Sequence, residues 1–167
     1  AFVEGALDLN GCHIATNVNL THCRFDRNID VTDAQLDGLF NLQGCYLAQG
    51  LNADRLSCSA DVALCNGFIA MREIRLLGAK IDGNLDCGGG CCEVTEGDAL
   101  SADGAEVKGS VYLCEGFRAT GKVRLVGAQI GGILDCSGGH FDVQLGDALS
   151  AYRSSIKGSV FLNDGFR

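Results

Sequence analysis

The chain repeats itself at a spacing of 49 residues without a gap. The segment GSVYLCEGFR at 109–118 returns as GSVFLNDGFR at 158–167, and GDALS at 97–101 returns at 146–150. A repeat of this length predicts a stack of similar units, because each unit can bury its apolar face only against its neighbours. Residues that recur in both copies therefore serve packing first, and the repeat indicates architecture more directly than function.

A finer pattern lies inside the 49-residue unit. Pairs of apolar residues separated by one residue, usually polar, recur at steps of five and six residues. Period-two alternation puts both apolar residues of a pair on one face of a short strand. Four such faces per turn predict an all-β fold, a four-sided parallel β-helix with almost no α-helix. Its first face is expected to begin, coil by coil, at Leu7, Ile29, Leu51, Ile74, Leu100, Val123 and Leu149, which makes about seven coils.

Residue size alternates in the columns of this predicted stack. On the second face a small residue precedes a large one by two places, as in Ala79 and Ile81, because a narrow interior admits a bulky side chain only beside a small one. On the fourth face we expect the first position to change from Cys23 and Cys45 to glycine, with three phenylalanines turned inward. The expected glycines are Gly67, Gly90, Gly116, Gly139 and Gly165, and the phenylalanines are Phe68, Phe117 and Phe166.

Two coils are longer than the others. Successive coils begin 22, 22, 23, 26, 23 and 26 residues apart, and the two long steps follow Cys92 and Phe141. The additional residues predict two projecting loops, Glu93 to Asp98 and Asp142 to Asp147. Because a rigid scaffold tolerates variation where the chain exceeds the needs of the fold, we expect any functional surface to include these loops.

Short segments of the chain resemble a known family. AQLDG at 34–38, AKIDG at 79–83 and AQIGG at 128–132 are similar to the units of pentapeptide-repeat proteins, which are right-handed quadrilateral β-helices, and the resemblance spans nearly the whole chain. VRLVGAQIGGILDC at 123–136 also resembles bacterial proteins built from VRLxGAxIxGxLD units, some of which carry an oxidoreductase label. The resemblance implies a bacterial repeat protein. Some members of the family imitate duplex DNA and bind topoisomerases.

Charge and hydropathy exclude several classes of function. The net charge of −8 argues against direct binding of nucleic acid, because phosphate contacts need clustered Lys and Arg. No apolar run approaches the roughly 18 residues that a membrane-spanning helix needs. We therefore expect a globular cytoplasmic domain over residues 1–167, with no membrane insertion.

The segment from Gly116 to Val123 matches the phosphate-binding P-loop pattern until its last position. Val123 stands where a Ser or Thr would ligate magnesium, and the segment leads into another predicted strand rather than into a helix. We therefore expect no nucleotide site and no cofactor.

The chain contains ten cysteines, and their positions follow the rhythm of the core. No CxxC pair is present, and Cys91 and Cys92 correspond to His140 and Phe141 in the next copy, whereas a metal site would keep its ligands. The interior cysteines are expected to be small apolar fillers with free thiols, which favours a reducing cytoplasm. These cysteines are Cys12, Cys23, Cys45, Cys58, Cys87, Cys92 and Cys136.

No arrangement of residues typical of catalysis is recognisable. His13, His22 and His140 are expected on different faces or far apart along the stack, and the chain has no GxSxG or HExxH motif. We expect no catalytic residues and no metal site, so the chain is not predicted to be an enzyme.

Aromatic side chains are predicted to point outward on the third face. Tyr112 and Phe161 lie one repeat apart, with Asp86 and Asp135 in alternate coils. Exposed aromatic residues on a flat sheet can mark a partner surface, and the alternative is that they pack over a neighbouring corner or loop. The candidate partner surface consists of this face and the acids of the two loops: Tyr112, Phe161, Asp86, Asp135, Glu93, Glu96, Asp98, Asp142 and Asp147.

These observations favour a non-enzymatic structural scaffold, a rigid β-helix rod that binds a protein partner. The resemblance leaves two alternatives: an acidic DNA mimic that binds a type II topoisomerase such as gyrase, and a scaffold domain of a larger enzyme with an oxidoreductase label. Both ends of the rod are expected to expose unpaired strand edges. We therefore expect either a homodimer formed end to end through the coil ends or a piece of a longer repeat protein.

Overall fold

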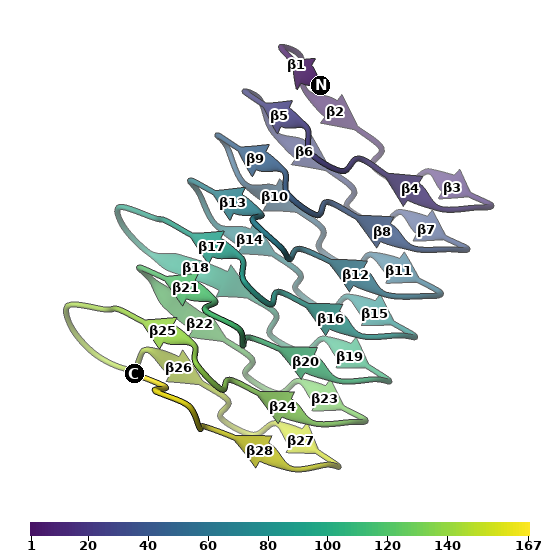
Figure 1. Cartoon of the computed structure of the whole chain (residues 1–167). Coiled ribbons are helices and arrows are strands. Elements are labelled where there is room, and N and C mark those ends of the chain that lie inside the picture. The colour runs from purple at the N-terminus through teal and green to yellow at the C-terminus, as the bar shows by residue number, and fades with distance from the viewer.

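A computed structural model describes residues 1–167 and shows four parallel sheets of seven strands each, with no helix. The chain visits the four sheets in turn, so every strand pairs with strands one coil before and one coil after it (Figure 1). The coils wind in the right-handed sense that parallel crossovers adopt. The predicted all-β solenoid of about seven coils is confirmed. No helix has the length and apolar character that a membrane span requires.

We number the faces in the order in which the chain meets them from Leu7. The first face contains β2 (Leu7–Asp8), β6 (Ile29–Asp30), β10 (Leu51–Asn52), β14 (Ile74–Arg75), β18 (Asp98–Ser101), β22 (Lys122–Arg124) and β26 (Leu149–Ser150). The second face contains β3 (His13–Ile14), β7 (Gln35–Leu36), β11 (Ser57–Cys58), β15 (Lys80–Ile81), β19 (Glu106–Val107), β23 (Gln129–Ile130) and β27 (Ser155–Ile156).

The other two faces have the same construction. The third face contains β4 (Val18–Asn19), β8 (Phe40–Asn41), β12 (Val62–Ala63), β16 (Leu85–Asp86), β20 (Val111–Tyr112), β24 (Leu134–Asp135) and β28 (Val160–Phe161). The fourth face contains β1 (Phe2–Val3), β5 (Arg24–Phe25), β9 (Tyr46–Leu47), β13 (Ile69–Ala70), β17 (Cys91–Cys92), β21 (Arg118–Ala119) and β25 (His140–Phe141).

The strand register confirms the predicted start of every coil on the first face. Each of the seven predicted residues lies opposite its counterpart in the next coil, from Leu7 opposite Ile29 to Val123 opposite Leu149. The strands are mostly two residues long, and 77 of the 104 backbone hydrogen bonds lie outside them. The corners between faces therefore contribute to holding the coils together.

The register of the fourth face differs from the prediction in every second coil. Ile69 pairs with Tyr46 and with Cys91, so Phe68 follows Cys45 in the column and Gly67 lies outside it. The predicted positions of Gly67, Gly116 and Gly165 are therefore wrong by one residue, whereas those of Gly90 and Gly139 are right. The observed column is Cys23, Cys45, Phe68, Gly90, Phe117, Gly139 and Phe166.

Turn geometry explains this shift. Asn66 and Gly67 have φ of 51° and 85°, and Glu115 and Gly116 repeat this with 55° and 82°. Two successive residues in the left-handed region form a tight turn, which glycine adopts without steric cost. The turn accommodates the additional residue of the six-residue step, and the phenylalanine after it enters the core.

Phenylalanine and glycine alternate in the first inward position of the fourth face. In the coil of Gly139 the ring is carried instead by Phe141, whose centroid lies 5.6 Å from that of Phe117 and 5.3 Å from that of Phe166. Phe68 and Phe117 are fully buried, and Phe166 packs partly buried against the core. A Cβ on Gly90 would lie 2.7 Å from the Leu64 carbonyl oxygen, and a Cβ on Gly139 would lie 2.6 Å from that of Leu113. Each glycine thus allows its own coil to approach closely the backbone of the preceding coil, which carries a ring.

Replacing Phe117 by alanine is expected to lower the free energy of unfolding by about 3–5 kcal/mol, because it leaves a cavity and removes the ring contact with Phe141. Urea unfolding followed by circular dichroism measures the change. Phe161→Ala, at an outward position of the third face, is the matched control and should change stability by about 0.5 kcal/mol or less. Equal losses in the two variants would contradict the register.

Candidate functional site

Both predicted loops project from the same corner of the solenoid. Loop one (93–98) joins β17 to β18 and loop two (142–147) joins β25 to β26, so each leads from the fourth face to the first. Figure 1 shows the two loops extending on the same side of the stack. The coil between them turns this corner without a loop, through Thr120, Gly121 and Lys122.

A groove of about 500 Å³ lies between the two loops. Its walls are Val94 to Asp98 of loop one and Asp142 to Leu145 of loop two, and its floor is Thr120, Gly121 and Lys122 of the unlooped coil. The groove exists because looped and unlooped coils alternate. It is therefore a direct consequence of the two-coil, 49-residue repeat.

Loop one is anchored to the floor of the groove by hydrogen bonds of a single threonine. The Val94 amide donates a hydrogen bond to Thr120 Oγ1 (2.9 Å), and that hydroxyl donates to the Val94 carbonyl oxygen (3.0 Å). The Val94 side chain is buried, and a Cβ on Gly121 would collide with its Cγ2. Thr120 and Gly121 therefore fix the inner part of loop one while its tip stays exposed.

The loop carboxylates lie along one corner, and one of them pairs with the lysine of the groove floor. Lys122 Nζ lies 3.8 Å from Asp147 Oδ2. Asp98 faces the first face instead, where its Oδ2 lies 3.5 Å from Arg124 Nε and accepts a hydrogen bond from Ser101 Oγ at 3.4 Å. The structure thus brings together acids of both loops that the sequence places about 50 residues apart.

Glu93, Glu96 and Asp142 complete the set of loop acids. Glu93 accepts only a long hydrogen bond of 3.5 Å from Cys91 Sγ. Glu96 and Asp142 form no ion pair or side-chain hydrogen bond. These two carboxylates are free to interact with an external group.

The two loops differ most at their tips. Leu145 of loop two is 93% exposed, and the equivalent residue of loop one is Glu96. Both residues line the groove, which therefore has one acidic wall and one apolar wall at corresponding positions. The sequence reasoning missed Leu145, Thr120 and Lys122. A comparison of the two copies residue by residue would have found Leu145, because packing of the core does not explain why an exposed Glu96 is replaced by a leucine.

The remaining predicted residues form a separate group. Asp86, Tyr112, Asp135 and Phe161 lie side by side on the third face in successive coils. The whole fourth face separates them from the loop corner (Figure 1). The predicted surface is thus divided into two regions that one small ligand could not contact together.

The aspartates of the third face bind the backbone of the turns that follow their strands. Asp86 Oδ1 accepts the Gly88 amide and Asp135 Oδ1 accepts the Ser137 amide, both at 2.9 Å. Such bonds to the backbone two residues ahead stabilise turns. The same bond recurs at Asp8, Asp30, Asn41 and Asn52, on the first and third faces. Recurrence in so many coils assigns these side chains to corner formation.

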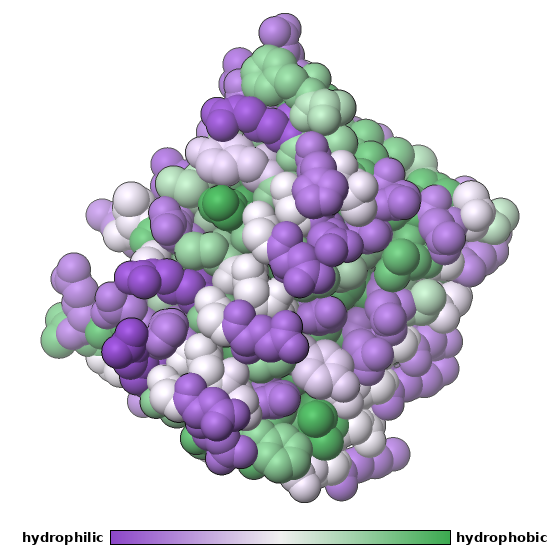
Figure 2. All heavy atoms as spheres, in the orientation of Figure 1, coloured by the Kyte–Doolittle hydropathy of each residue, from purple (hydrophilic) through white to green (hydrophobic).

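Four aspartates outside the loops are paired with bases of the next coil. Arg55 binds Asp33 through two hydrogen bonds of 2.7 Å, and Arg75 and Arg124 bind Asp54 and Asp103 in the same way one and three coils later. The hydrogen bond from Arg55 holds the pKa of Asp33 below its usual range. Figure 2 shows hydrophilic and hydrophobic residues interleaved rather than one uniform patch.

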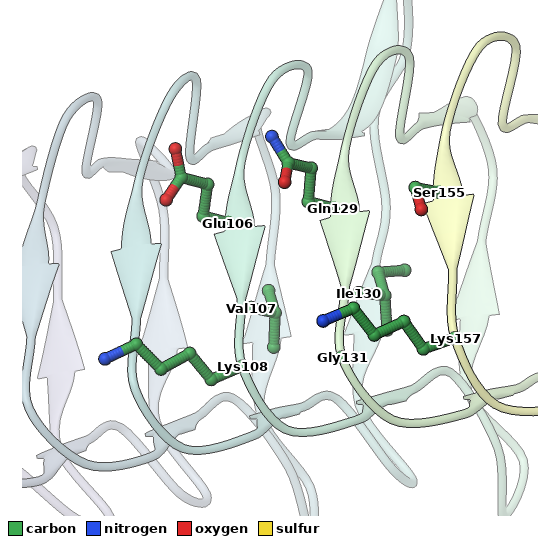
Figure 3. A pocket seen from close by; sticks show the side chains of 8 residues that line it. All are labelled: Glu106, Val107, Lys108, Gln129, Ile130, Gly131, Ser155 and Lys157. Carbon is green, nitrogen blue, oxygen red and sulfur yellow. The ribbon is translucent and has the colours of Figure 1, made fainter.

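A shallow hollow of about 130 Å³ on the second face is also lined by residues of both copies, as is one of about 370 Å³ between Arg118, Asp142 and Arg167. Figure 3 shows Glu106, Gln129 and Ser155 along its length and the lysines Lys108 and Lys157 beside it. Lys108 forms an ion pair with Asp82 at 2.7 Å. The position equivalent to Asp82 in the next copy is Gly131, whose backbone packs against the Lys108 carbonyl oxygen. Mixed charges and small depth make this hollow a weak binding site.

The P-loop look-alike is part of the solenoid. Gly116 to Val123 passes through a turn, β21 and a corner into β22, and Val123 is buried in the core. No helix N-terminus is available to receive a phosphate.

The cysteines are all free thiols, and most are buried as predicted. Of the seven cysteines predicted to be interior, Cys23 is only half-buried and Cys12 is exposed. Cys12 lies in the first coil, which has a neighbouring coil on one side only on this face. Burial raises the pKa of Cys92 and of Cys136 to about 12, so both thiols stay protonated and unreactive near neutral pH. No group of three or more His, Cys, Asp and Glu side chains is arranged to hold a metal ion.

Comparisons of the chain with protein-family models, with curated proteins and with solved structures find no match.

Iodoacetamide at pH 8 is expected to modify Cys12 rapidly in the native protein and to leave Cys92 and Cys136 unmodified, because burial shields these thiols and keeps them protonated. Mass spectrometry of proteolytic fragments locates the modified residues. After denaturation, all ten cysteines should react. Labelling of native Cys92 as fast as Cys12 would show that the core is open.

Thr120→Val should release loop one, because valine keeps the shape of threonine and removes both hydrogen bonds to Val94. The free energy of local opening is expected to fall by about 1–2 kcal/mol, which accelerates amide exchange of Val94 about 5- to 30-fold. Hydrogen exchange measured by NMR detects this change. Thr95→Val in the exposed part of the same loop is the matched control. An equal effect there would contradict the role of the two hydrogen bonds between Thr120 and Val94.

Proposed function

We propose that this chain is a non-enzymatic scaffold of the pentapeptide-repeat type, a rigid β-solenoid that presents its loop corner to a protein partner. The observation that carries the proposal is the groove between the two loops. It contains the unpaired carboxylates Glu96 and Asp142 and the exposed Leu145, and the coil geometry requires none of these groups.

The flat faces offer less to a partner. Some charges at their corners pair across coils, as Arg55 does with Asp33, and several of their aspartates close corners, as Asp86 does. Tyr112 is only partly exposed, and Phe161 is 38% exposed. Loops on a rigid scaffold are the usual place for binding residues, since the scaffold holds them at a low entropic cost.

The four-sided coils and the alternation of small and large inward residues support the assignment to the pentapeptide-repeat type. The inward pair Ala79 and Ile81, within AKIDG, lies on the second face with both side chains buried. The free and mostly buried thiols fit a reducing compartment, and we propose the cytoplasm as the location.

The alternative role as a DNA mimic rests on the net charge of −8 and on the resemblance to the family. A mimic of duplex DNA needs a continuous acidic surface. Arg75 pairs with Asp54 and Arg124 with Asp103 at the corner that follows the first face, so the acids there alternate with bases. The distribution of charge therefore favours the loop corner, and a protein partner, over imitation of a nucleic acid.

A photo-crosslinking amino acid at position 145 tests the proposal in the cells that produce the protein. We expect a discrete protein adduct from position 145 and none from position 57 on the second face, where Ser57 is exposed. Deleting residues 95–97 shortens loop one to the 23-residue step of an unlooped coil and should abolish the adduct. Adducts of equal yield from positions 145 and 57, or an adduct that survives the deletion, would contradict the proposal.

A further inference from the structure

The geometry points to one extended, basic polypeptide segment with an aliphatic side chain as the occupant of the groove between the loops. This inference rests on the proposed function and deepens it, because it gives the chemistry of the partner segment.

The width of the groove fits a single chain. Loop one and loop two belong to the fourth and sixth coils, with one unlooped coil between them. Neighbouring strands lie about 4.8 Å apart, so the loops are separated by roughly 10 Å. One extended chain at the level of the unlooped coil lies about 4.8 Å from each loop, which is the spacing of adjacent strands. A helix, with a diameter of about 10–12 Å, is too wide.

The charge of the groove selects the sign of the segment. Glu96 and Asp142 have no intramolecular partner, and Asp147 has only Lys122 at 3.8 Å. Basic side chains in alternate positions share one face of an extended segment, from which one lysine can turn to Glu96 on one wall and another to Asp142 on the other. An acidic segment, or a nucleic acid, would meet two unpaired carboxylates for one cation and would be repelled.

Leu145 supplies the apolar part of the contact. Its side chain is 93% exposed and lines the groove. Burying an exposed leucine against an aliphatic side chain contributes favourably in proportion to the apolar area removed from water. Charge then attracts and orients the segment, while Leu145 distinguishes an amphipathic segment from a purely basic one.

A labelled peptide of the sequence KLKVKLK, with blocked ends, is the probe for fluorescence anisotropy at low salt. We expect it to bind saturably, and binding should weaken about tenfold or more in Leu145→Ser and in the double variant Glu96→Gln, Asp142→Asn. The double variant should also lose most of the salt dependence, because screening acts on the exposed charges. Glu106→Gln on the second face is the matched control and should bind as the unmodified protein does. Its carboxylate is equally exposed and lies outside the groove.

Two further peptides separate the parts of the inference. KSKSKSK should bind at least about tenfold more weakly than KLKVKLK if Leu145 contributes, and ELEVELE should not bind. Equal affinity of KLKVKLK and KSKSKSK, equal affinity for all protein variants, or no binding of KLKVKLK would overturn the inference. If KLKVKLK fails while the adduct at position 145 depends on loop one, the occupant is wrong and the proposed function stands.

Discussion

The structure depends on complementary packing between coils whose strands are only two residues long. No strand of this length is stable by itself, so each coil is held by the parallel hydrogen bonds and by the side chains of the coils beside it. The alternation of Phe68, Gly90, Phe117 and Gly139 shows how closely the coils fit. In this column a phenylalanine is followed by a glycine in the next coil, and the alternation has the same period of two coils as the sequence repeat.

The same period creates the groove. If every coil carried a loop, the corner would be a continuous ridge, and without loops it would be a flat edge. Because a loop follows Cys92 and Phe141 but the coil between them turns at Thr120, the corner contains a slot one chain wide. The residues that the copies share thus serve stability, and the proposed recognition rests on a residue that they do not share, Leu145 in place of Glu96.

Much of the fold could be predicted from the sequence. Apolar pairs with period two, recurring at steps of five and six residues, determine which residues point inward on three of the four faces. The predicted register of the fourth face was wrong in every second coil, because the sequence of a six-residue step does not show which of its residues is the additional one. The left-handed turn at Asn66 and Gly67 decides it, and backbone angles of this kind follow from the three-dimensional context. The loops were predicted, whereas their common groove was not, because it depends on how two corners two coils apart are placed. Tyr112 and Asp86 were predicted to belong to a partner surface because of their residue type. Only the structure shows that Asp86 closes a turn.

The central claim is that the residues of the flat faces serve the packing of the coils, whereas the loop corner binds the partner. Hydrogen–deuterium exchange of the chain with and without the protein captured at position 145 tests it most directly. We predict protection of residues 94–97, 120–122 and 143–146, with unchanged exchange on the second and third faces. Protection of the third-face column from Asp86 to Phe161, with no change at the loops, would contradict the account.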